Sequence, residues 1–445
     1  MTEISESVGH FKGLYADAED RLPGARVAWV AKRRQAAMSR FAELGLPAPR
    51  DEEWKYTSLK PIEKRAFALP EAGDHGVTAA DVAPFVFEEP AAHRLVFVDG
   101  AYRPDLSQAA ELPAGVTAMP LSEALAEGSE TLSHHLGRYA DPEGTPFVAL
   151  NTALMSDGVF LHVPAGVSMA APVHLLFMAS TEADERLMSY RNVLVAEEGA
   201  SATVLESYVG LGEGAYLTNA VTEAVAPAGA DLTVYKLQEE AETAYHIAAF
   251  EAYQGGASQV AHHNISLGAR LARNDVGDAL DAEGAHVTLN GLYLGDGRQH
   301  VDNHTRIDHL QANATSSEYY KGILDGRARG VFNGKVVVQP QAQGTDSDQQ
   351  NRNLLLSRNA EVDPKPELEI FADDVSCTHG ATIGQLDDNA LFFLQTRGMS
   401  FAEARSLLIF GFANEIIERI AVEPVRARLE ERLLHRLPHT EAMED

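Results

Sequence analysis

The chain has 445 residues, of which 45% are apolar and 23% are charged, a composition typical of a globular protein with a large core. Its formal net charge of −29 argues against nucleic acid or an anionic membrane as the main partner, because both attract basic surfaces. A single cysteine excludes an internal disulfide framework, and neither a signal-peptide pattern nor a membrane-length apolar run is present, so we expect a soluble, cytoplasmic protein.

The first part of the chain, residues 1–85, is predicted to be a helical region. Residues 25–44 space their apolar side chains three and four apart among many arginines and lysines, as a surface helix does. Residues 86–155 form a mixed connecting region. In it, RLVFVDGAY at 94–102 has the pattern of a strand, and a short helix is expected near 121–132.

Helical spacing disappears between residues 156 and 395, where short alternating segments follow one another, including ATVLESYVG, ADLTVYKLQ, HVTLNGLYL, KVVVQP and LFFLQT. A small residue followed by alanine opens successive segments. These alanines lie 29, 30, 27, 28, 29, 46 and 30 residues apart: Ala171, Ala200, Ala230, Ala257, Ala285, Ala314, Ala360 and Ala390. A near-constant period with strands in each repeat predicts a parallel β-helix core. An antiparallel sandwich, with turns every 8–12 residues, is the alternative.

The 46-residue interval implies a turn of the β-helix without its marker, or an insertion. After it, residues 396–445 are predicted to be helical again. Ser400 and Glu403 have the spacing of a capping box, and Pro424 suits the first turn of a second helix. The first of these helices is apolar on more than one face, so we expect it to be buried on several sides. The hairpin either caps the β-helix or docks a partner, and the residues alone leave both open.

Complete motifs for common chemistry are missing: the sequence has no P-loop, Rossmann, C-x-x-C, H-E-x-x-H or G-x-S-x-G string. Histidines do gather between residues 262 and 309, at His262, His263, His286, His300, His304 and His309. We favour hydrogen-bonded imidazoles over a metal site for this group. Two acid pairs, at 373–374 and 387–388, raise a β-helical carbohydrate-active enzyme of the lyase type as an alternative. Acids at strand corners are, however, typical of turns.

The only cysteine, Cys377, stands two residues before His379, and residues at this spacing share a face of a strand. A thiol and an imidazole are suited to iron, zinc or copper, but two ligands do not hold a metal alone. The alternative is that Cys377 is a small buried apolar residue and His379 a core histidine.

Long strings from Tyr319 onward closely resemble the core of the SufB/SufD family of iron–sulfur cluster assembly proteins. They are YYKGILDG, VFNGKVVVQPQAQGTDSDQQNRNLLLS, AEVDPKPELEIFADDVSCTHGATIGQLDDNALFFLQTRGMS and EARSLLIFGFANEII. Upstream, DEEWKYTSL at 51–59 is similar to an entry motif of the SufD branch. The single cysteine and the short chain also favour that branch over SufB. Within the entry motif, Trp54 and Tyr56 are expected to be packing residues.

The resemblance implies a mainly β fold, a right-handed parallel β-helix flanked by N-terminal and C-terminal helical regions. It implies a non-enzymatic scaffold subunit of a SufBCD-type complex, with no tightly bound cofactor. A SufB-like paralogue would join its β-helix to this one, and the chain could form a homodimer when alone. The alternative is that this chain is itself a SufB-like paralogue that acts as a homodimer. A SufC-like ABC ATPase would dock on the C-terminal helices, through Phe401, Leu408, Phe412 and Ile416.

The resemblance also implies a site at the junction with SufB. There, His379 would bind metal while a transient iron–sulfur cluster or iron is assembled. Cys377 lies beside it and is the weaker candidate.

Overall fold

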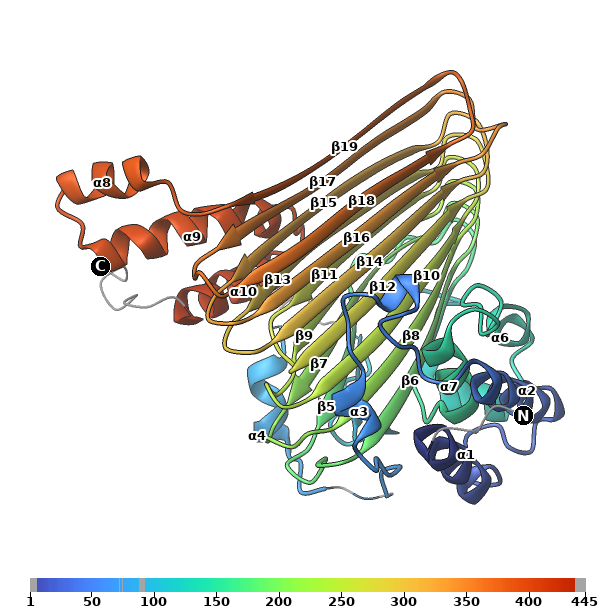
Figure 1. Ribbon diagram of the computed structural model, residues 1–445. Helices are drawn as coiled ribbons and strands as arrows, with labels where there is room; N and C mark the ends of the chain where they lie inside the picture. Colours follow the sequence, from blue (N-terminus) through green and yellow to red (C-terminus); the bar gives the residue numbers. More distant parts are fainter. Residues whose placement is uncertain (1–5, 72, 74, 88–92, 437–445) are drawn as a thin grey trace.

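A computed structural model describes residues 6–71, 73, 75–87 and 93–436 (Figure 1). Its body is a parallel β-helix in which each turn contributes one strand to each of two sheets. The first sheet has ten strands in the order β19-β17-β15-β13-β11-β9-β7-β5-β1-β2. The second has nine, in the order β18-β16-β14-β12-β10-β8-β6-β4-β3. The prediction of a mainly β fold built on a parallel β-helix is confirmed, and the sandwich alternative is wrong.

The strands of the first sheet are β1 (His93–Val98), β2 (Ala101–Tyr102), β5 (Val173–Ala179), β7 (Ser201–Gly210), β9 (Asp231–Glu239), β11 (Gln259–Ser266), β13 (His286–Gly295), β15 (Thr315–Leu324), β17 (Thr345–Leu355) and β19 (Val375–Gly384). Those of the second are β3 (Thr117–Pro120), β4 (Val159–Val163), β6 (Leu187–Ala196), β8 (Leu217–Ala226), β10 (Tyr245–Gln254), β12 (Leu271–Leu280), β14 (His300–His309), β16 (Arg329–Val338) and β18 (Glu361–Ile370). The structure therefore brings β1, from the predicted connecting region, into the first sheet beside β5.

The register explains the alanine period. From β4 onward, paired residues on neighbouring turns lie from 26 positions apart, as Tyr245 and Leu271 do, to 33 positions apart, as Phe160 and Val193 do. Four of the marker alanines precede strands of the first sheet and are fully buried at the corners: Ala200, Ala230, Ala285 and Ala314. Only a small side chain fits where the chain turns inward at such a corner.

The 46-residue interval between Ala314 and Ala360 has a simple cause. Thr345 opens β17 in place of an alanine, and Ala360 precedes β18, which belongs to the opposite sheet half a turn later. The prediction that LFFLQT is a strand opened by Ala390 is wrong. These residues lie in a helix, α8 (Asp388–Thr396), because the Asp387 side chain accepts a hydrogen bond from the Asn389 amide and caps the helix N-terminus.

Helices from the first part of the chain pack around the first turns (Figure 1). The longer ones are α1 (Glu6–Ala18), α2 (Ala28–Leu44) and α7 (Pro146–Leu154); α2 packs on α7, and α7 packs on β6 and β8. The shorter ones are η1 (Glu52–Trp54), α3 (Lys60–Glu63), α4 (Ala79–Val82), η2 (Ala83–Phe85), α5 (Leu121–Glu127) and α6 (Glu130–His135). Most of these helices bury apolar side chains on the outer face of the nine-stranded sheet, which is why β6 and β8 are buried on both faces. The exceptions are α4 and η2, whose Val82 and Phe85 pack with β1, β5 and β7 of the ten-stranded sheet.

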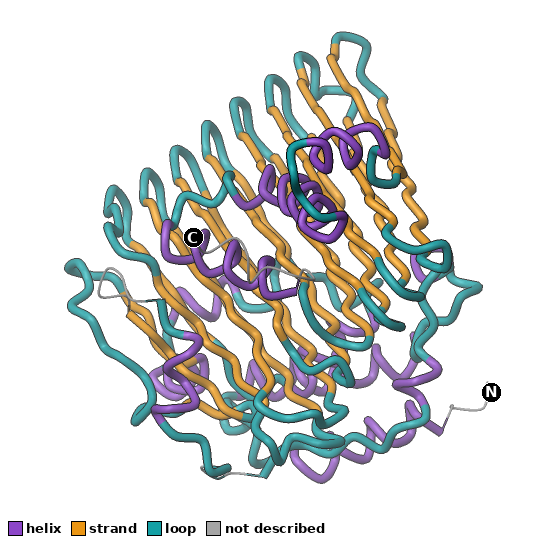
Figure 2. Tube along the Cα trace, turned by 90° about the vertical axis from the view of Figure 1, so that its left-hand side faces the viewer, coloured by secondary structure: helices purple, strands orange, loops and turns teal. Residues whose placement is uncertain are grey.

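The C-terminal helices lie on the outer face of the ten-stranded sheet, as Figure 2 shows from the side. They are α9 (Phe401–Ile417) and α10 (Glu423–Arg436), and α9 begins with the predicted capping box of Ser400 and Glu403. Because α9 contacts β13 and β15 rather than the last turn, the hairpin is no cap for the β-helix. Among the residues that the structure describes, no helix is both long and apolar enough to cross a membrane.

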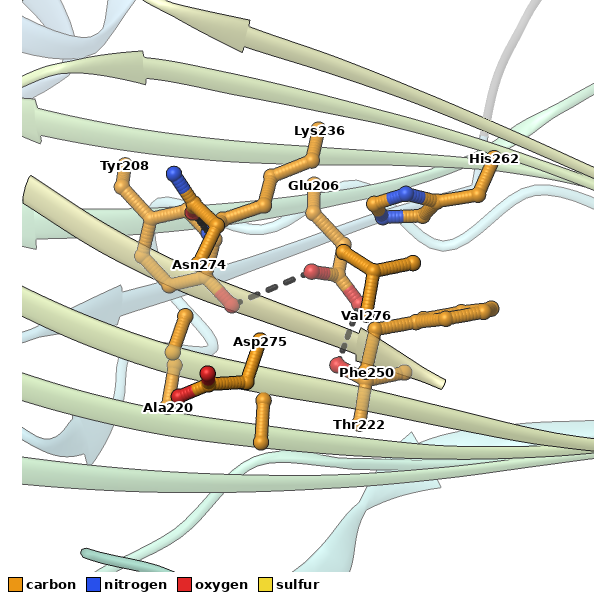
Figure 3. A pocket seen from close by; sticks show the side chains of 12 residues that line it. Glu206, Tyr208, Ala220, Thr222, Lys236, Phe250, His262, Asn274, Asp275 and Val276 are labelled. Atoms are coloured by element: carbon orange, nitrogen blue, oxygen red, sulfur yellow. Dashed lines mark hydrogen bonds between the residues drawn. The ribbon is translucent and has the colours of Figure 1, made fainter. Parts of the chain in front are cut away.

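The interior of the β-helix holds buried polar groups as well as apolar ones. In the middle turns, the Glu206 carboxylate accepts hydrogen bonds from Thr222 at 2.7 Å and from Tyr208 at 3.1 Å (Figure 3). Burial lowers the pKa of Lys236 nearby to about 8. Since these groups are enclosed between the two sheets, they stabilise the interior and offer no open cleft for a substrate.

Candidate functional site

The two ends of the β-helix differ in how their strand edges are covered. At the first end, short antiparallel strands close the sheets, β2 beside β1 and β3 beside β4. At the other end, β19 and β18 are the last strands of their sheets, and each is ten residues long. Within the described part of the chain, neither has a partner on its outer edge. A long bare strand edge is a template for pairing with another chain.

Cys377 and His379 both lie on β19, at this open end. Their partners on β17 are Ser347 and Gln349, which are 2% and 0% exposed and face the interior, while Asp348 between them faces out. Cys377 and His379 therefore share the inner face of the last turn, as their spacing predicted. They differ in exposure. Cys377 packs partly buried against the apolar interior, whereas His379 is exposed.

The surroundings of Cys377 make its thiol a poor ligand. Burial and, next, the charge of Asp346 raise the pKa of the Cys377 thiol. A thiol binds metal and attacks electrophiles as the thiolate, so a raised pKa lowers both abilities. In the described part of the chain, no group of three or more His, Cys, Asp or Glu residues is arranged to hold a metal ion. His379 is thus left with one weak neighbour and needs ligands from elsewhere.

Exposed apolar side chains flank the edge strands. Ile370 at the end of β18 is 39% exposed, Phe371 at the following corner is 60% exposed, and Ile383 on β19 is 52% exposed. By register, Ile370 follows the buried Val338 in an inner apolar row, and Ile383 follows the buried Asn353 on the inner face of the other sheet. An apolar row that stops at a bare edge is completed by a further turn stacked on it.

The four predicted docking residues of the C-terminal helices are placed differently from one another. Phe401 is 57% exposed, and Leu408 and Phe412 are half-buried. Ile416 is fully buried against the ten-stranded sheet, so its prediction as a docking residue is wrong. Its helix is apolar all round, and the sequence did not reveal which face the sheet covers.

Phe392 and Phe393 on α8 are the most exposed aromatic pair and were missed by the sequence prediction. They are 68% and 56% exposed, and α8 extends away from the β-helix (Figure 1). The misreading of LFFLQT as a strand hid them, because a strand would have buried one of the two. With Phe401 they form an apolar surface, which we name the α8 knob.

The histidines between 262 and 309 do not form a metal site. His309 hydrogen-bonds Ser316, His286 hydrogen-bonds Thr315, and His300 hydrogen-bonds Thr57. His262 is buried in the interior and stacked on Phe250, with ring centroids 4.2 Å apart. The structure agrees with separate packed and hydrogen-bonded imidazoles, as we favoured.

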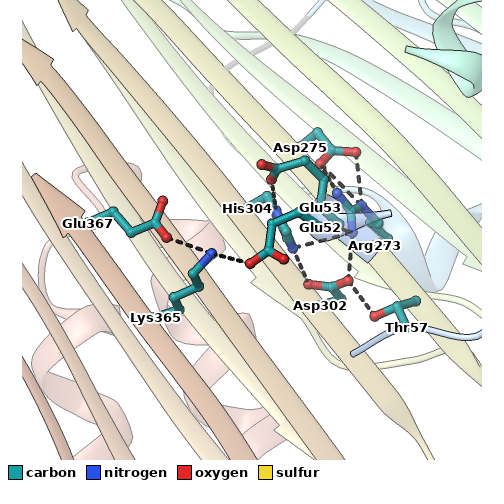
Figure 4. Close-up of polar contacts among 9 residues, drawn as sticks. All are labelled: Glu52, Glu53, Thr57, Arg273, Asp275, Asp302, His304, Lys365 and Glu367. Atoms are coloured by element: carbon teal, nitrogen blue, oxygen red, sulfur yellow. Dashed lines mark hydrogen bonds and ion pairs between the residues drawn. The ribbon is translucent and has the colours of Figure 1, made fainter. Parts of the chain in front are cut away.

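The entry motif binds the outer face of the nine-stranded sheet. Trp54 is 7% exposed and lies over the Arg273 guanidinium at 3.9 Å, which confirms it as a packing residue. Arg273 also pairs with Asp302 at 2.9 Å, and the Thr57 hydroxyl donates to the same carboxylate (Figure 4). His304 completes the network.

His304 is the titratable centre of this contact. It lies 3.0 Å from Asp302 and 3.3 Å from Glu53. Burial disfavours the imidazolium, but the charge of Asp302 and the hydrogen bonds to Asp302 and Glu53 outweigh burial and raise the pKa of His304 to about 9. Farther along, Glu52 pairs with Lys365 of β18 at 2.8 Å. The entry motif, which we name the clasp (51–59), thus reaches from the middle turns to the last one.

A groove of about 570 Å³ lies beside the clasp on the same outer face. It gathers acidic and basic side chains on one sheet face, an arrangement that the sequence did not show. Three of its four arginine and lysine side chains pair with carboxylates: Arg273 with Asp275, Arg306 with Asp308, and Lys335 with Glu369. The fourth, Arg138, lies over the Tyr139 ring. The acid pairs 373–374 and 387–388 lie instead at a corner and at the start of α8, as turn residues do.

The fold defines a parallel β-helical protein with one open end in the described chain, and comparison with known proteins supplies its family. The SUF system FeS cluster assembly SufBD core domain matches residues 177–412, and the SufBD protein N-terminal region matches residues 5–175. The chain is 33% identical to an iron–sulfur cluster assembly SufBD family protein of Synechocystis, over 96% of this chain and 95% of that protein.

It is 31% identical to the iron–sulfur cluster assembly protein SufD of Escherichia coli, over 91% of this chain and 92% of that protein. To SufB of Bacillus subtilis it is 26% identical, over 69% of this chain and 66% of that protein. The chain belongs to the SufBD family of iron–sulfur cluster assembly proteins. The resemblance predicted from the sequence is confirmed, and the SufD relative matches over more of the chain than this SufB does.

Proposed function

We propose that this chain is the SufD-type scaffold subunit of a SUF complex and that a SufB-like paralogue extends its β-helix at the open end. The bare edges of β18 and β19 carry the proposal, because they are long, adjacent and flanked by exposed apolar side chains. Strand pairing across such an edge supplies main-chain hydrogen bonds, and the apolar rows supply packing. The role is that of a non-enzymatic scaffold in the cytoplasm.

His379 is the residue that we assign to cluster assembly. It stands on the inner face of the last strand, exposed, at the place where a stacked turn would cover it. Imidazole is a suitable iron ligand and is available at neutral pH. The remaining ligands would come from the SufB-like chain, and the iron or cluster is a transient cargo held between the two chains.

A SufC-like ABC ATPase is the second partner, and we place its docking surface on the α8 knob. Phe392, Phe393 and Phe401 are exposed, whereas the inner face of α9 is occupied by the sheet. Aromatic side chains of this kind are common anchors of protein interfaces. The knob lies at the C-terminal helices and not on the bare strand edges, so both partners have room to bind at once.

The test of the site is His379→Ala in the reconstituted complex, with Thr378→Ala as the matched control on the outer face of the same strand. Complex assembly is expected to be unchanged by either variant, because the proposed junction is held by strand pairing and by apolar packing rather than by these two side chains. Cluster transfer to an apo acceptor protein is expected to fail with His379→Ala alone. Normal transfer by that variant would overturn the assignment of His379.

The two partner surfaces are separated by a crossed pull-down. Phe392→Ser with Phe393→Ser is expected to lose the ATPase and keep the SufB-like chain, whereas Phe371→Ser is expected to do the reverse. Deleting residues 399–437 is a poorer test, because α9 and α10 bury apolar residues against the sheet. Undiminished ATPase recovery with the double variant would remove the α8 knob as its docking surface.

A carbohydrate-active enzyme of the lyase type remains the rival function, and the charged groove is the only described feature that favours it. Arg273, Arg306 and Lys335 are paired with carboxylates of the same sheet, which leaves these three cations poorly placed to neutralise a uronate. We expect no turnover of uronate polymers by the purified chain, measured as the rise in ultraviolet absorbance that a lyase product gives.

A further inference from the structure

Three polar residues lie in register on successive strands, in a row that runs from the interior to the open end. Glu318 on β15, Gln349 on β17 and His379 on β19 are register partners in turn, Glu318 with Gln349 and Gln349 with His379. All three stand on the inner face of the ten-stranded sheet, where neighbouring strands are about 4.8 Å apart. Glu318 and Gln349 are 1% and 0% exposed, so the first two residues of the row are shielded from water.

The side-chain amide of Gln349 has a hydrogen-bond partner for its nitrogen but none for its oxygen. Its Nε2 donates a hydrogen bond to Glu318 Oε2 at 2.7 Å. Its Oε1 is buried and has no hydrogen-bond partner. The nitrogen and oxygen of an amide point in different directions, so an amide nitrogen held on the β15 side turns the oxygen away from β15. The strand on the other side is β19, with His379 opposite.

Room for this amide is made by a glycine on the facing sheet. A Cβ at Gly334 of β16 would collide with Gln349 Nε2. A buried acceptor without a partner costs about 1–3 kcal/mol unless something satisfies it. An imidazole N–H from the next strand would do so. Histidines that bind metal through one ring nitrogen regularly donate the other N–H to a carbonyl or carboxylate, which fixes the tautomer and the ring orientation.

We propose that Gln349, held in place by Glu318, is the positioning residue for His379. The amide oxygen of Gln349 accepts the N–H of one ring nitrogen, and the other nitrogen, which carries no proton, then faces the open end as the metal ligand. The metal-binding half of this statement rests on the proposed function, whereas the orientation of the ring does not.

The test uses the full chain labelled with ¹⁵N-histidine, alone and bound to the SufB-like paralogue, at pH 8. At this pH Glu318, whose pKa burial raises to about 7, is mostly ionised. The nitrogen chemical shifts of His379, assigned by their loss in His379→Ala, report the tautomer. The variants are Gln349→Met and, as the matched control, Gln350→Met, which alters the same residue type on the opposite face of β17.

Gln349→Met is expected to move His379 from one dominant tautomer to a mixture, and Gln350→Met to leave it unchanged. Glu318→Leu is expected to act like Gln349→Met. Glu318→Gln is expected to keep the wild-type tautomer, because its amide oxygen still accepts from Gln349. If the His379 shifts are the same in Gln349→Met and wild type, both alone and in the complex, the positioning role is overturned.

Iron binding to the complex separates this inference from the proposed function. Loss of an outer partner of a metal-binding histidine typically weakens metal affinity 10–100-fold, and this is the loss expected for Gln349→Met. A tautomer that changes in Gln349→Met, together with iron binding that His379→Ala leaves intact, would uphold the positioning role and refute the metal role of His379.

Discussion

The two ends of the β-helix differ in whether the edges of their last strands are covered. At the closed end, antiparallel strands of two and four residues end the sheets, and helices bury their outer surface. At the open end, two ten-residue edges and three exposed apolar side chains are left without cover in the described chain. The first arrangement prevents pairing with other chains, and the second invites it.

The two ends also differ in how deeply their ion pairs are buried. Near the closed end, Arg191 and Glu223 form an ion pair at 2.6 Å with both side chains fully buried. Glu223 also accepts hydrogen bonds from the backbone amides of Gly137, Arg138 and Tyr139, and so ties the loop before α7 to the sheet. Near the open end, ion pairs such as Lys335 with Glu369 are partly exposed. We therefore expect the first end to contribute more to stability than the last.

The largest expected effect is on stability at the closed end. Arg191→Met removes one partner of the buried pair, leaves the Glu223 charge enclosed, and is expected to lower the free energy of unfolding by about 3–5 kcal/mol. Lys335→Met is the matched control and is expected to cost less than about 1 kcal/mol, because its pair is partly exposed. Urea unfolding measures both. Equal losses would show that the closed end is not where stability is concentrated.

The clasp connects the middle turns of the β-helix to the last turn, and its contribution to the free energy of unfolding depends on pH. The pKa of His304 is raised to about 9, above the roughly 6.5 of an unfolded histidine. Its stabilisation is therefore complete below about pH 6.5 and is lost as the pH rises through 9. At 1.36 kcal/mol per unit, the full loss is at most about 3 kcal/mol.

The measurement is the difference in unfolding free energy between wild type and His304→Asn, taken from pH 6 to pH 9.5. Using the difference cancels other groups that titrate in this range. What remains in the difference is the interaction of the His304 side chain with the charged groups that face it, Asp302, Arg273 and Glu53. The difference is expected to shrink as the pH rises. A difference independent of pH would mean that His304 is neutral in the folded chain.

A smaller effect is expected at the open end, and in binding rather than stability. Ile383→Lys places a charge on the inner face of β19, at an exposed apolar position that a stacked turn would cover. It is expected to weaken association with the SufB-like chain at least tenfold, or about 1.4 kcal/mol. Stability of the isolated chain should change by less than about 0.5 kcal/mol, since Ile383 is 52% exposed. Thr382→Lys, on the outer face of the same strand, is the control, and equal weakening by both would argue against end-to-end stacking.

The sequence predicted the β-helix because its period comes from local corner residues. Ala200 and Ala230 are buried where the chain turns inward, and Ala285 and Ala314 are buried at equivalent corners. The capping box at Ser400 and Glu403 was equally local. Properties that depend on distant packing were not predicted. Whether Ile416 faces the sheet or a partner depends on the placement of α9 against β13 and β15.

The sequence also did not predict which residues pair between neighbouring strands of the β-helix. Gln349 and His379 are 30 positions apart, and Glu318 and Gln349 are 31 positions apart. A period known only to within a few residues does not fix such partners, because a shift by one residue turns a side chain to the opposite face. The spacing of Cys377 and His379 needed no register, so their shared face was predicted correctly while Gln349 was not noticed.

The smallest effect separates the two members of that pair. Cys377 is partly buried against the interior, and its thiol pKa is raised, so Cys377→Ala removes only a small apolar contact. We expect a loss of about 1 kcal/mol or less in unfolding free energy, and cluster transfer by the complex at the wild-type level. The same transfer assay with His379→Ala is the comparison. Failed transfer by Cys377→Ala, with the complex intact, would make the thiol a ligand despite its burial and would divide the role now given to His379 between both residues.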